Sequence, residues 1–109
     1  MNDAIRLSRA QRNVKFGIFI NRIIEHPCKI SKPVTRQLTK YKRQFEATVN
    51  DKVLGEVIQS NLRVLEQVEL YAKARNAGDE IAEKRHLNES IRLWDEGSEI
   101  TNRICEELS

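Results

Sequence analysis

The clearest structural signal in the chain lies at residues 76–108, NAGDEIAEKRHLNESIRLWDEGSEITNRICEEL. Gly78 can take the left-handed conformation that ends one helix, and Asp79 can cap the next. The pattern predicts a long helix from Asp79 to about Glu107. Within it, Gly97 costs about 1 kcal/mol relative to alanine, so we expect a close helix–helix contact there. Seven residues recur at alternating spacings of four and three, as in a heptad seam: Leu87, Ile91, Trp94, Ser98, Thr101, Cys105 and Leu108.

Two further helices are predicted in the first half of the chain. The first covers about residues 3–25, where apolar residues at i, i+3, i+4, i+7 and i+8 share one face. His26-Pro27 ends it, because a residue before proline is pushed out of the helical region. The second helix begins at Ser31, a capping residue, with Pro33 in its first turn.

A third helix follows the capping pair Asn50-Asp51, or else it continues the second as one bent helix. The tight turn at 76–79 joins it to the last helix in an antiparallel αα-hairpin. We therefore predict an all-α fold: a small antiparallel helical bundle of four helices that ends in a long αα-hairpin. Three long helices with a bent middle one are the alternative. The 109 residues, with only four Gly and two Pro, fit a single domain over 1–109.

Charge is unevenly distributed along the chain, although its formal net charge is only +3. Residues 1–50 hold 11 Lys+Arg and 3 Asp+Glu, a balance of +8, and residues 51–109 hold 8 and 13, a balance of −5. An excess of cations attracts anionic partners, so the basic half predicts either nucleic acid or an acidic protein as partner. The acidic half is an ordinary solvated surface, or it meets the basic half of another copy in a head-to-tail homo-oligomer.

The second predicted helix carries the most distinct basic face. Arg36, Lys40 and Arg43 lie at i, i+4 and i+7, away from the apolar stripe. Cations at such density bind phosphates by releasing counterions, without a defined sequence. A plain solvated helix face is the alternative interpretation. The predicted nucleic-acid-binding residues are Lys29, Lys32, Arg36, Lys40, Lys42 and Arg43.

The segment ISKPVTRQL at residues 30–38 resembles the recognition helix of helix-turn-helix regulators. These helices often open with a serine, followed by small or β-branched residues, an arginine and a leucine. In that family the polar positions near the helix start meet base edges. The resemblance implies that Ser31, Thr35, Arg36 and Lys40 face DNA.

A second resemblance concerns the layout of the whole chain. An apolar helix ends in a proline turn, and a basic helix follows. The third helix carries Ser60-Asn61-Leu62-Arg63, and the last helix carries Trp94 and Ile100. This order is similar to that of the small four-helix-bundle proteins that accompany reverse transcriptases in diversity-generating retroelements. The resemblance implies an oligomer whose basic surface holds nucleic acid and a polymerase.

Other classes of function lack their sequence signals. The spacing of His26, Cys28, His86 and Cys105 predicts no metal site, and no serine lies in a nucleophile motif. We expect no catalysis, no cofactor and no small-molecule substrate. The longest apolar cluster, about nine residues, is too short for a membrane span, and the start of the chain is unlike a secretory signal. We expect a cytoplasmic protein with free thiols.

Trp94 is the single tryptophan, and it shares its seam with Ser98 and Thr101. The favoured interpretation of Trp94 is a core anchor. The polar neighbours also make these three residues a candidate interface, because a monomer core prefers apolar side chains there. We therefore predict an accessory or regulatory protein of a nucleic-acid-handling system. The alternative is a mobile-element type adaptor or inhibitor that binds a partner protein and no nucleic acid.

Overall fold

The computed structural model describes residues 3–25, 29–52 and 54–108, with side chains described from residue 14 onward except at 105 and 108. These residues form helices and connecting turns, without a strand. The predicted all-α bundle of four helices with a closing hairpin is therefore confirmed. The helices are α1 (Asp3–Glu25), α2 (Lys32–Thr48), α3 (Gly55–Ala77) and α4 (Glu80–Leu108).

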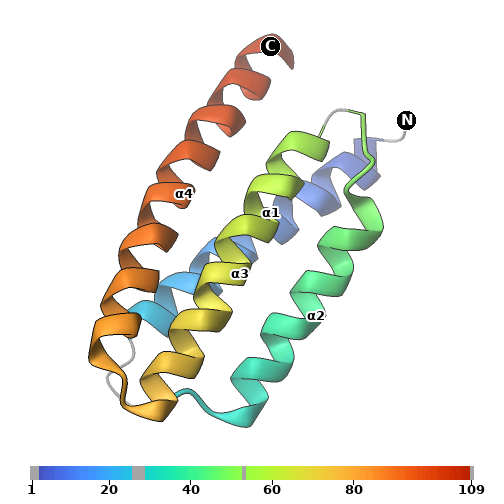
Figure 1. The fold of residues 1–109 in the computed structure, drawn as a ribbon. Coiled ribbons are helices and arrows are strands. Elements are labelled where there is room, and N and C mark those ends of the chain that lie inside the picture. The colour runs from blue at the N-terminus through green and yellow to red at the C-terminus, as the bar shows by residue number, and fades with distance from the viewer. Residues whose placement is uncertain (1–2, 26–28, 53, 109) are drawn as a thin grey trace.

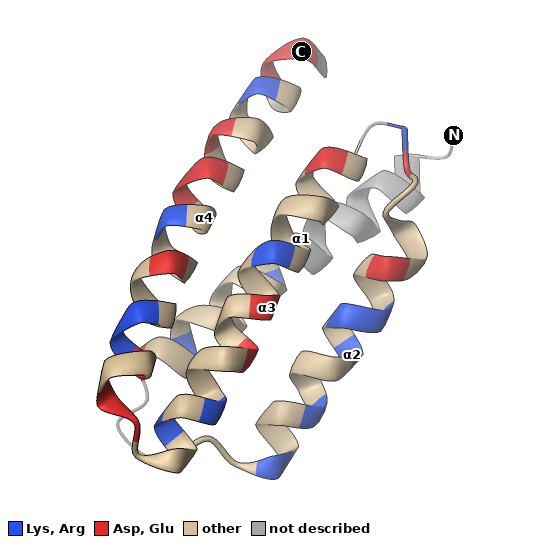
Figure 2. Cartoon of the chain, in the orientation of Figure 1, with Lys and Arg blue, Asp and Glu red and all other residues tan. Residues whose placement is uncertain are grey.

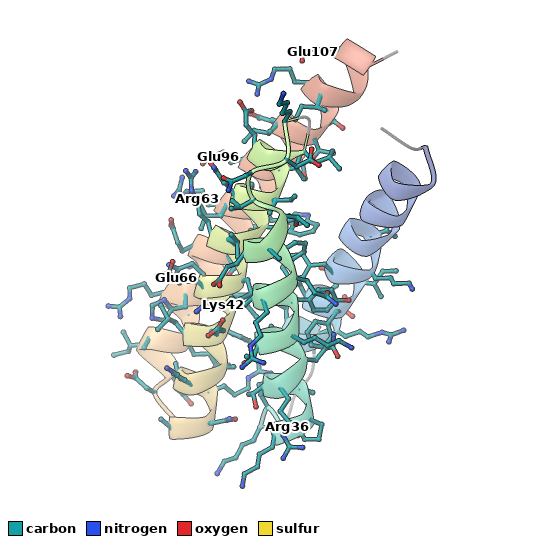
Figure 3. The ribbon with its side chains drawn as sticks, turned by 90° about the vertical axis from the view of Figure 1, so that its right-hand side faces the viewer. Arg36, Lys42, Arg63, Glu66, Glu96 and Glu107 are labelled. Carbon is teal, nitrogen blue, oxygen red and sulfur yellow. The ribbon has the colours of Figure 1, made fainter. Side chains whose placement is uncertain are left out.

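The helices form a layer of three with the fourth against it. In Figure 1, α3 lies between α2 and α4, and α1 passes behind α3. The turned view in Figure 3 shows α1 set to one side of the layer that the other three helices make. The bundle is elongated, with extents of 46 × 25 × 20 Å. Of its helix pairs, α3 and α4 are the most closely packed.

The hairpin turn between α3 and α4 forms as predicted. Gly78 has φ 74° and ψ 17°, the left-handed conformation. Its N–H donates to the carbonyl of Arg75 at 3.1 Å, and the N–H of Asp79 donates to the carbonyl of Ala74 at 2.9 Å. Asp79 then caps α4, because its Oδ1 accepts from the N–H of Ala82 at 3.1 Å. Both ends of the turn thus satisfy backbone groups that would otherwise lack partners.

A real break separates α2 from α3, so the alternative of one bent helix is wrong. After Thr48, the last residue of α2, the chain turns at Asp51. The Oδ1 of Asp51 accepts from the N–H of Leu54 at 2.8 Å, and its carbonyl accepts from the N–H of Gly55 at 2.9 Å. Asp51 thus satisfies two donors where the chain enters α3, but the N-cap residue is Leu54 and α3 has no side-chain cap among the described residues, so the predicted capping role of Asp51 is wrong.

The start of α2 is held differently from the prediction. Ser31 is the N-cap residue, with φ −76° and ψ 161°, but its hydroxyl makes no capping hydrogen bond within the described part of the chain. The adjacent residue is anchored instead by the end of α3. Asn76 Oδ1 accepts from the N–H of Ile30 at 2.7 Å, and Asn76 Nδ2 donates to the carbonyl of Ile30 at 3.0 Å. Upstream, α1 ends at Glu25 as predicted, and the turn His26-Pro27 lies outside the described residues.

Aromatic rings join α1, α2 and α4 in the core. Phe16 is fully buried, with its ring centroid 4.9 Å from that of Phe45, 5.2 Å from Tyr41 and 6.3 Å from Trp94. Phe19 adds a further contact to Tyr41 at 5.5 Å. Each such buried side chain contributes about 1.5–3 kcal/mol relative to an exposed one. This cluster positions α2, and therefore the basic face on its outer side.

The heptad residues predicted for α4 are not the residues at the centre of its contact with α3. Ile91 is 47% exposed and Ser98 is also exposed, whereas Ser90 and Ile104 are buried. The close contact runs through small residues, because a Cβ added to Gly97 would overlap the Oγ of Ser60 on α3. The close approach predicted at Gly97 is confirmed. Small residues allow the two backbones to come together, and Trp94 of the predicted seam packs against Phe16 and Gly17 of α1.

Candidate nucleic-acid interface

The outer face of α2 carries three of the predicted cations in one row. Arg36, Lys40 and Arg43 are exposed. Each residue advances a helix by about 100°, so positions i, i+4 and i+7 fall on one side. The opposite side of the same helix holds the buried Leu38 and Phe45. Figure 2 shows Lys and Arg repeating along α2, where Glu46 is the one acidic residue.

These cations differ from many of those on the hairpin in lacking ionic partners. Among the described residues, no carboxylate forms an ion pair with any of the six predicted cations. Four arginines on α3 and α4, by contrast, are paired. Arg92 also lowers the pKa of Glu89, chiefly through its hydrogen bond to that carboxylate. The pairs are Arg75–Glu83 at 2.8 Å, Arg63–Glu96 at 3.9 Å, Arg92–Glu96 at 3.3 Å, Arg92–Glu89 and Arg103–Glu56.

The structure brings some of the predicted residues together and separates others. Lys32, at the start of α2, extends the row by one turn because it precedes Arg36 by four. Lys42 lies about 100° around the helix from Arg43. In Figure 3 it is on the side toward α3 and Glu66, away from Arg36. We therefore define the outer basic face as Lys32, Arg36, Lys40 and Arg43, with Lys42 on a neighbouring side.

Lys29 lies before α2 and joins a cation that the sequence analysis did not select. Arg22, in the last turn of α1, lines the same cavity of about 280 Å³, together with Phe19, Ile23 and Val34. A cation in the last turn of a helix faces the negative end of the helix dipole. That position in the last turn was the signal that could have identified Arg22. Lys29 and Arg22 thus add two cations, near the start of α2, to the four of the outer basic face.

The residues that the helix-turn-helix resemblance assigns to DNA are only partly together. Ser31, Arg36 and Lys40 are exposed. Thr35 is half-buried, and its hydroxyl donates to the carbonyl of Lys32 at 2.8 Å. It lines a cavity between α2 and α3 that also includes Lys73. Thr35 therefore lies on the side of α2 toward α3, apart from Arg36 and Lys40, and its contact with DNA stays a prediction.

The predicted interface residues lie on the far side of the bundle from α2. Trp94 and Thr101 are half-buried, and Ser98 is exposed. All three line a groove of about 380 Å³ between α1 and α4. Val14 and Ile18 of α1 line the same groove and were not selected from the sequence. Their spacing of four, on a different side from Phe16 and Ile20, was the signal that could have identified them.

Comparisons with protein-family models, with curated proteins and with solved structures found no match for this chain. None of the described helices combines the length and the apolar character needed to cross a bilayer. In the part of the chain that the structure describes, no three His, Cys, Asp or Glu side chains gather as metal ligands do.

Proposed function

We propose that this protein is a non-catalytic accessory or regulatory protein that binds nucleic acid through the outer basic face of α2. The observation that supports the proposal is the contrast in pairing. Arg36, Lys40 and Arg43 are exposed and without an ion pair among the described residues, whereas Arg75 and Arg103 on the hairpin are bonded to carboxylates. Cations that are not neutralised within the fold remain available to an external anion.

The shape of the outer basic face suits a phosphate backbone. With a rise of about 1.5 Å per residue, the row from Lys32 to Arg43 is about 16 Å long. A nucleic-acid strand advances about 3.4 Å of axis per phosphate in B-DNA, so such a row can neutralise several phosphates. Arginine adds geometric fit, because its planar guanidinium can hold one phosphate with two hydrogen bonds. Contacts of this kind position a protein on nucleic acid without reading its sequence.

Fluorescence anisotropy tests the proposal with labelled single-stranded and duplex DNA and RNA of equal length. The triple variant Arg36→Ala, Lys40→Ala, Arg43→Ala removes the centre of the outer basic face. For duplex DNA, the slope of log K against log salt should fall by about 0.9 for each phosphate that the variant no longer neutralises. The control variant Lys52→Ala, Lys84→Ala, Arg85→Ala removes the same charge from exposed cations elsewhere. It should keep the wild-type slope.

Two outcomes would overturn the proposal. If the wild-type protein binds none of the four nucleic acids at low salt, the cations of α2 have another use. If both triple variants lose affinity equally, net charge alone drives binding and the outer basic face is not the site. In the first case the rival function gains support. An adaptor or inhibitor would use the same cations to cover an acidic surface on a partner protein.

A further inference from the structure

The groove between α1 and α4 exposes apolar side chains that the fold leaves partly uncovered. The two helices come close at Gly17, where an added Cβ would lie 3.0 Å from Cη2 of Trp94. On α1, Val14 is 63% exposed and Ile18 is 49% exposed. On α4, Ile91 is 47% exposed, although it does not line the groove itself. Trp94 lines the groove itself, so a tryptophan is within reach of any molecule that enters it.

The two edges of this groove carry opposite charge. On α1, Lys15 and Arg22 lie three residues before and four residues after Ile18, and both are exposed. Neither lines the groove itself, and Arg22 also lines the cavity at Lys29 on the other side of α1. On α4, Asp95 and Glu99 are exposed and lie beside the groove residue Ser98. None of these four charged residues has an ion pair within the described ranges. The groove is therefore an apolar strip with a basic edge on one helix and an acidic edge on the other.

We propose that a second copy of this chain occupies the groove, forming a two-fold symmetric dimer. In a two-fold interface each surface patch meets the same patch of the partner, so residue i contacts j and residue j contacts i. When the two-fold axis runs along the groove, parallel to the helices, the rotation places the basic edge of α1 against the acidic edge of the other copy's α4, twice. It also covers Val14 and Ile18, the exposed apolar residues that line the groove, with apolar surface. A groove with two like-charged edges would not complement itself in this way.

The size and position of the surface agree with this occupant. A stable complex buries about 800 Å² on each partner. A long side of the 46 × 25 × 20 Å bundle offers an area of that order. The outer basic face is not covered, because α2 and α4 lie on opposite sides of α3 (Figure 1). The proposed dimer contact therefore does not use the surface proposed for nucleic acid. A dimer would present two outer basic faces to one ligand.

Sedimentation velocity with two complementary charge variants tests the dimer directly. One variant carries Asp95→Lys and Glu99→Lys, and the other carries Lys15→Glu and Arg22→Glu. In a dimer of either variant alone, edges of like charge would meet, so each should sediment as a monomer at low salt. In a mixture, every basic edge meets an acidic one. The mixture should therefore regain the dimer of the wild-type chain.

The apolar part of the interface is tested by a matched pair of substitutions. Ile18→Asp places a charge in the groove and should abolish the dimer. Ile81→Asp makes the same change at a residue that is 84% exposed and does not line the groove, so it should leave the dimer intact. Circular dichroism checks that both variants remain helical. Ile18 is about half exposed and Ile81 mostly exposed, and neither belongs to the buried core, so neither change removes a core side chain.

Several results would overturn the proposal. A wild-type chain that stays monomeric up to about 100 μM has no dimer with a micromolar Kd. Oligomers larger than two indicate a head-to-tail contact in place of a two-fold one. A mixture of the charge variants that stays monomeric, or equal effects of the two aspartate substitutions, excludes the groove as the interface.

Discussion

Asn76 holds Ile30 through both ends of its side-chain amide, across 46 residues of sequence. The two hydrogen bonds, 2.7 and 3.0 Å long, use the N–H and the carbonyl of one residue. They fix the segment before α2 to the last turn of α3. Lys29 and Lys32 flank Ile30, so this contact also fixes where the cations at the start of α2 lie.

Replacing Asn76 by alanine should destabilise the fold by about 1–3 kcal/mol, because two partly buried hydrogen bonds disappear and a backbone donor and acceptor are left without their partner. Urea denaturation followed by circular dichroism measures the change. Asn88→Ala, at an exposed position of α4, is the control and should change the free energy of unfolding by less than about 0.5 kcal/mol. Equal effects of the two substitutions would mean that the contact to Ile30 contributes nothing.

The contact between Asn76 and Ile30 marks the limit of what could be predicted from this sequence. Local signals were sufficient for Gly78 and Asp79, because caps and turns depend on residues within about one helical turn. Asn76 shows nothing local that would pair it with a backbone 46 residues away. The heptad pattern of α4 also does not say which of its residues face α3, and Ile91 in that pattern is exposed whereas Gly97 makes the close contact.

The candidate site could likewise be predicted only where it depends on spacing within one helix. The row of Arg36, Lys40 and Arg43 follows from helical spacing alone, and the structure places these residues together. Thr35 and Lys42 could not be assigned in that way, because their side of α2 depends on where α3 packs. The groove at Trp94 depends on how α1 crosses α4, which no spacing within one helix determines.

Gly97→Ala should destabilise the protein even though alanine favours helix by about 1 kcal/mol. The new methyl group would overlap the Oγ of Ser60, and such overpacking costs about 1–3 kcal/mol. We expect a net loss of up to about 2 kcal/mol in the free energy of unfolding. Thermal and urea denaturation of the purified variant measure it.

A double-mutant cycle separates the two effects at Gly97. Ser60→Ala removes the overlapping oxygen and leaves its Cβ 3.3 Å from the position of the new methyl group. In that background Gly97→Ala should be neutral or slightly stabilising, which gives an interaction energy of about 1–2 kcal/mol between the sites. If the two changes are additive, the close approach of α3 and α4 at this point is not what requires glycine.

The stability of the fold should decrease in alkaline solution through Tyr71. Burial raises the pKa of Tyr71 above its ordinary value, and the nearby Arg75 lowers it by a smaller amount. The hydroxyl of Tyr71 donates to the carbonyl of Ile24 at 3.5 Å, and the guanidinium of Arg75 lies 4.8 Å from the ring centroid. The folded state therefore binds the phenolic proton more tightly than the unfolded state does.

The sign of the effect follows from that difference in proton binding. The contribution of Tyr71 is complete below pH about 10, the ordinary tyrosine pKa, and is lost as the pH rises toward the higher pKa of the folded state. In that window the free energy of unfolding should fall by up to about 1.4 kcal/mol per pH unit from this group. Tyr71→Phe should show a shallower decline. Parallel pH profiles for the two proteins would contradict the assignment.

The triple variant Arg36→Ala, Lys40→Ala, Arg43→Ala should be at least as stable as the wild-type protein. These side chains are exposed, and like charges four residues apart on a helix repel each other by about 0.2–0.5 kcal/mol. Their removal should raise the free energy of unfolding slightly at low salt, and the gain should vanish at high salt as the repulsion is screened. Alanine also matches or exceeds both residues in helix propensity.

Arg75→Ala provides the contrast for this last prediction. Its guanidinium pairs with Glu83 at 2.8 Å, and both side chains are mostly buried, at 17% and 24% exposure. Its removal should cost about 1–3 kcal/mol, because a charge-assisted hydrogen bond and a cation–π contact disappear together. Urea denaturation at two salt concentrations compares the variants. If the triple variant loses more than about 1 kcal/mol, the cations of α2 stabilise the fold, and weaker nucleic-acid binding by that variant would no longer identify a binding site.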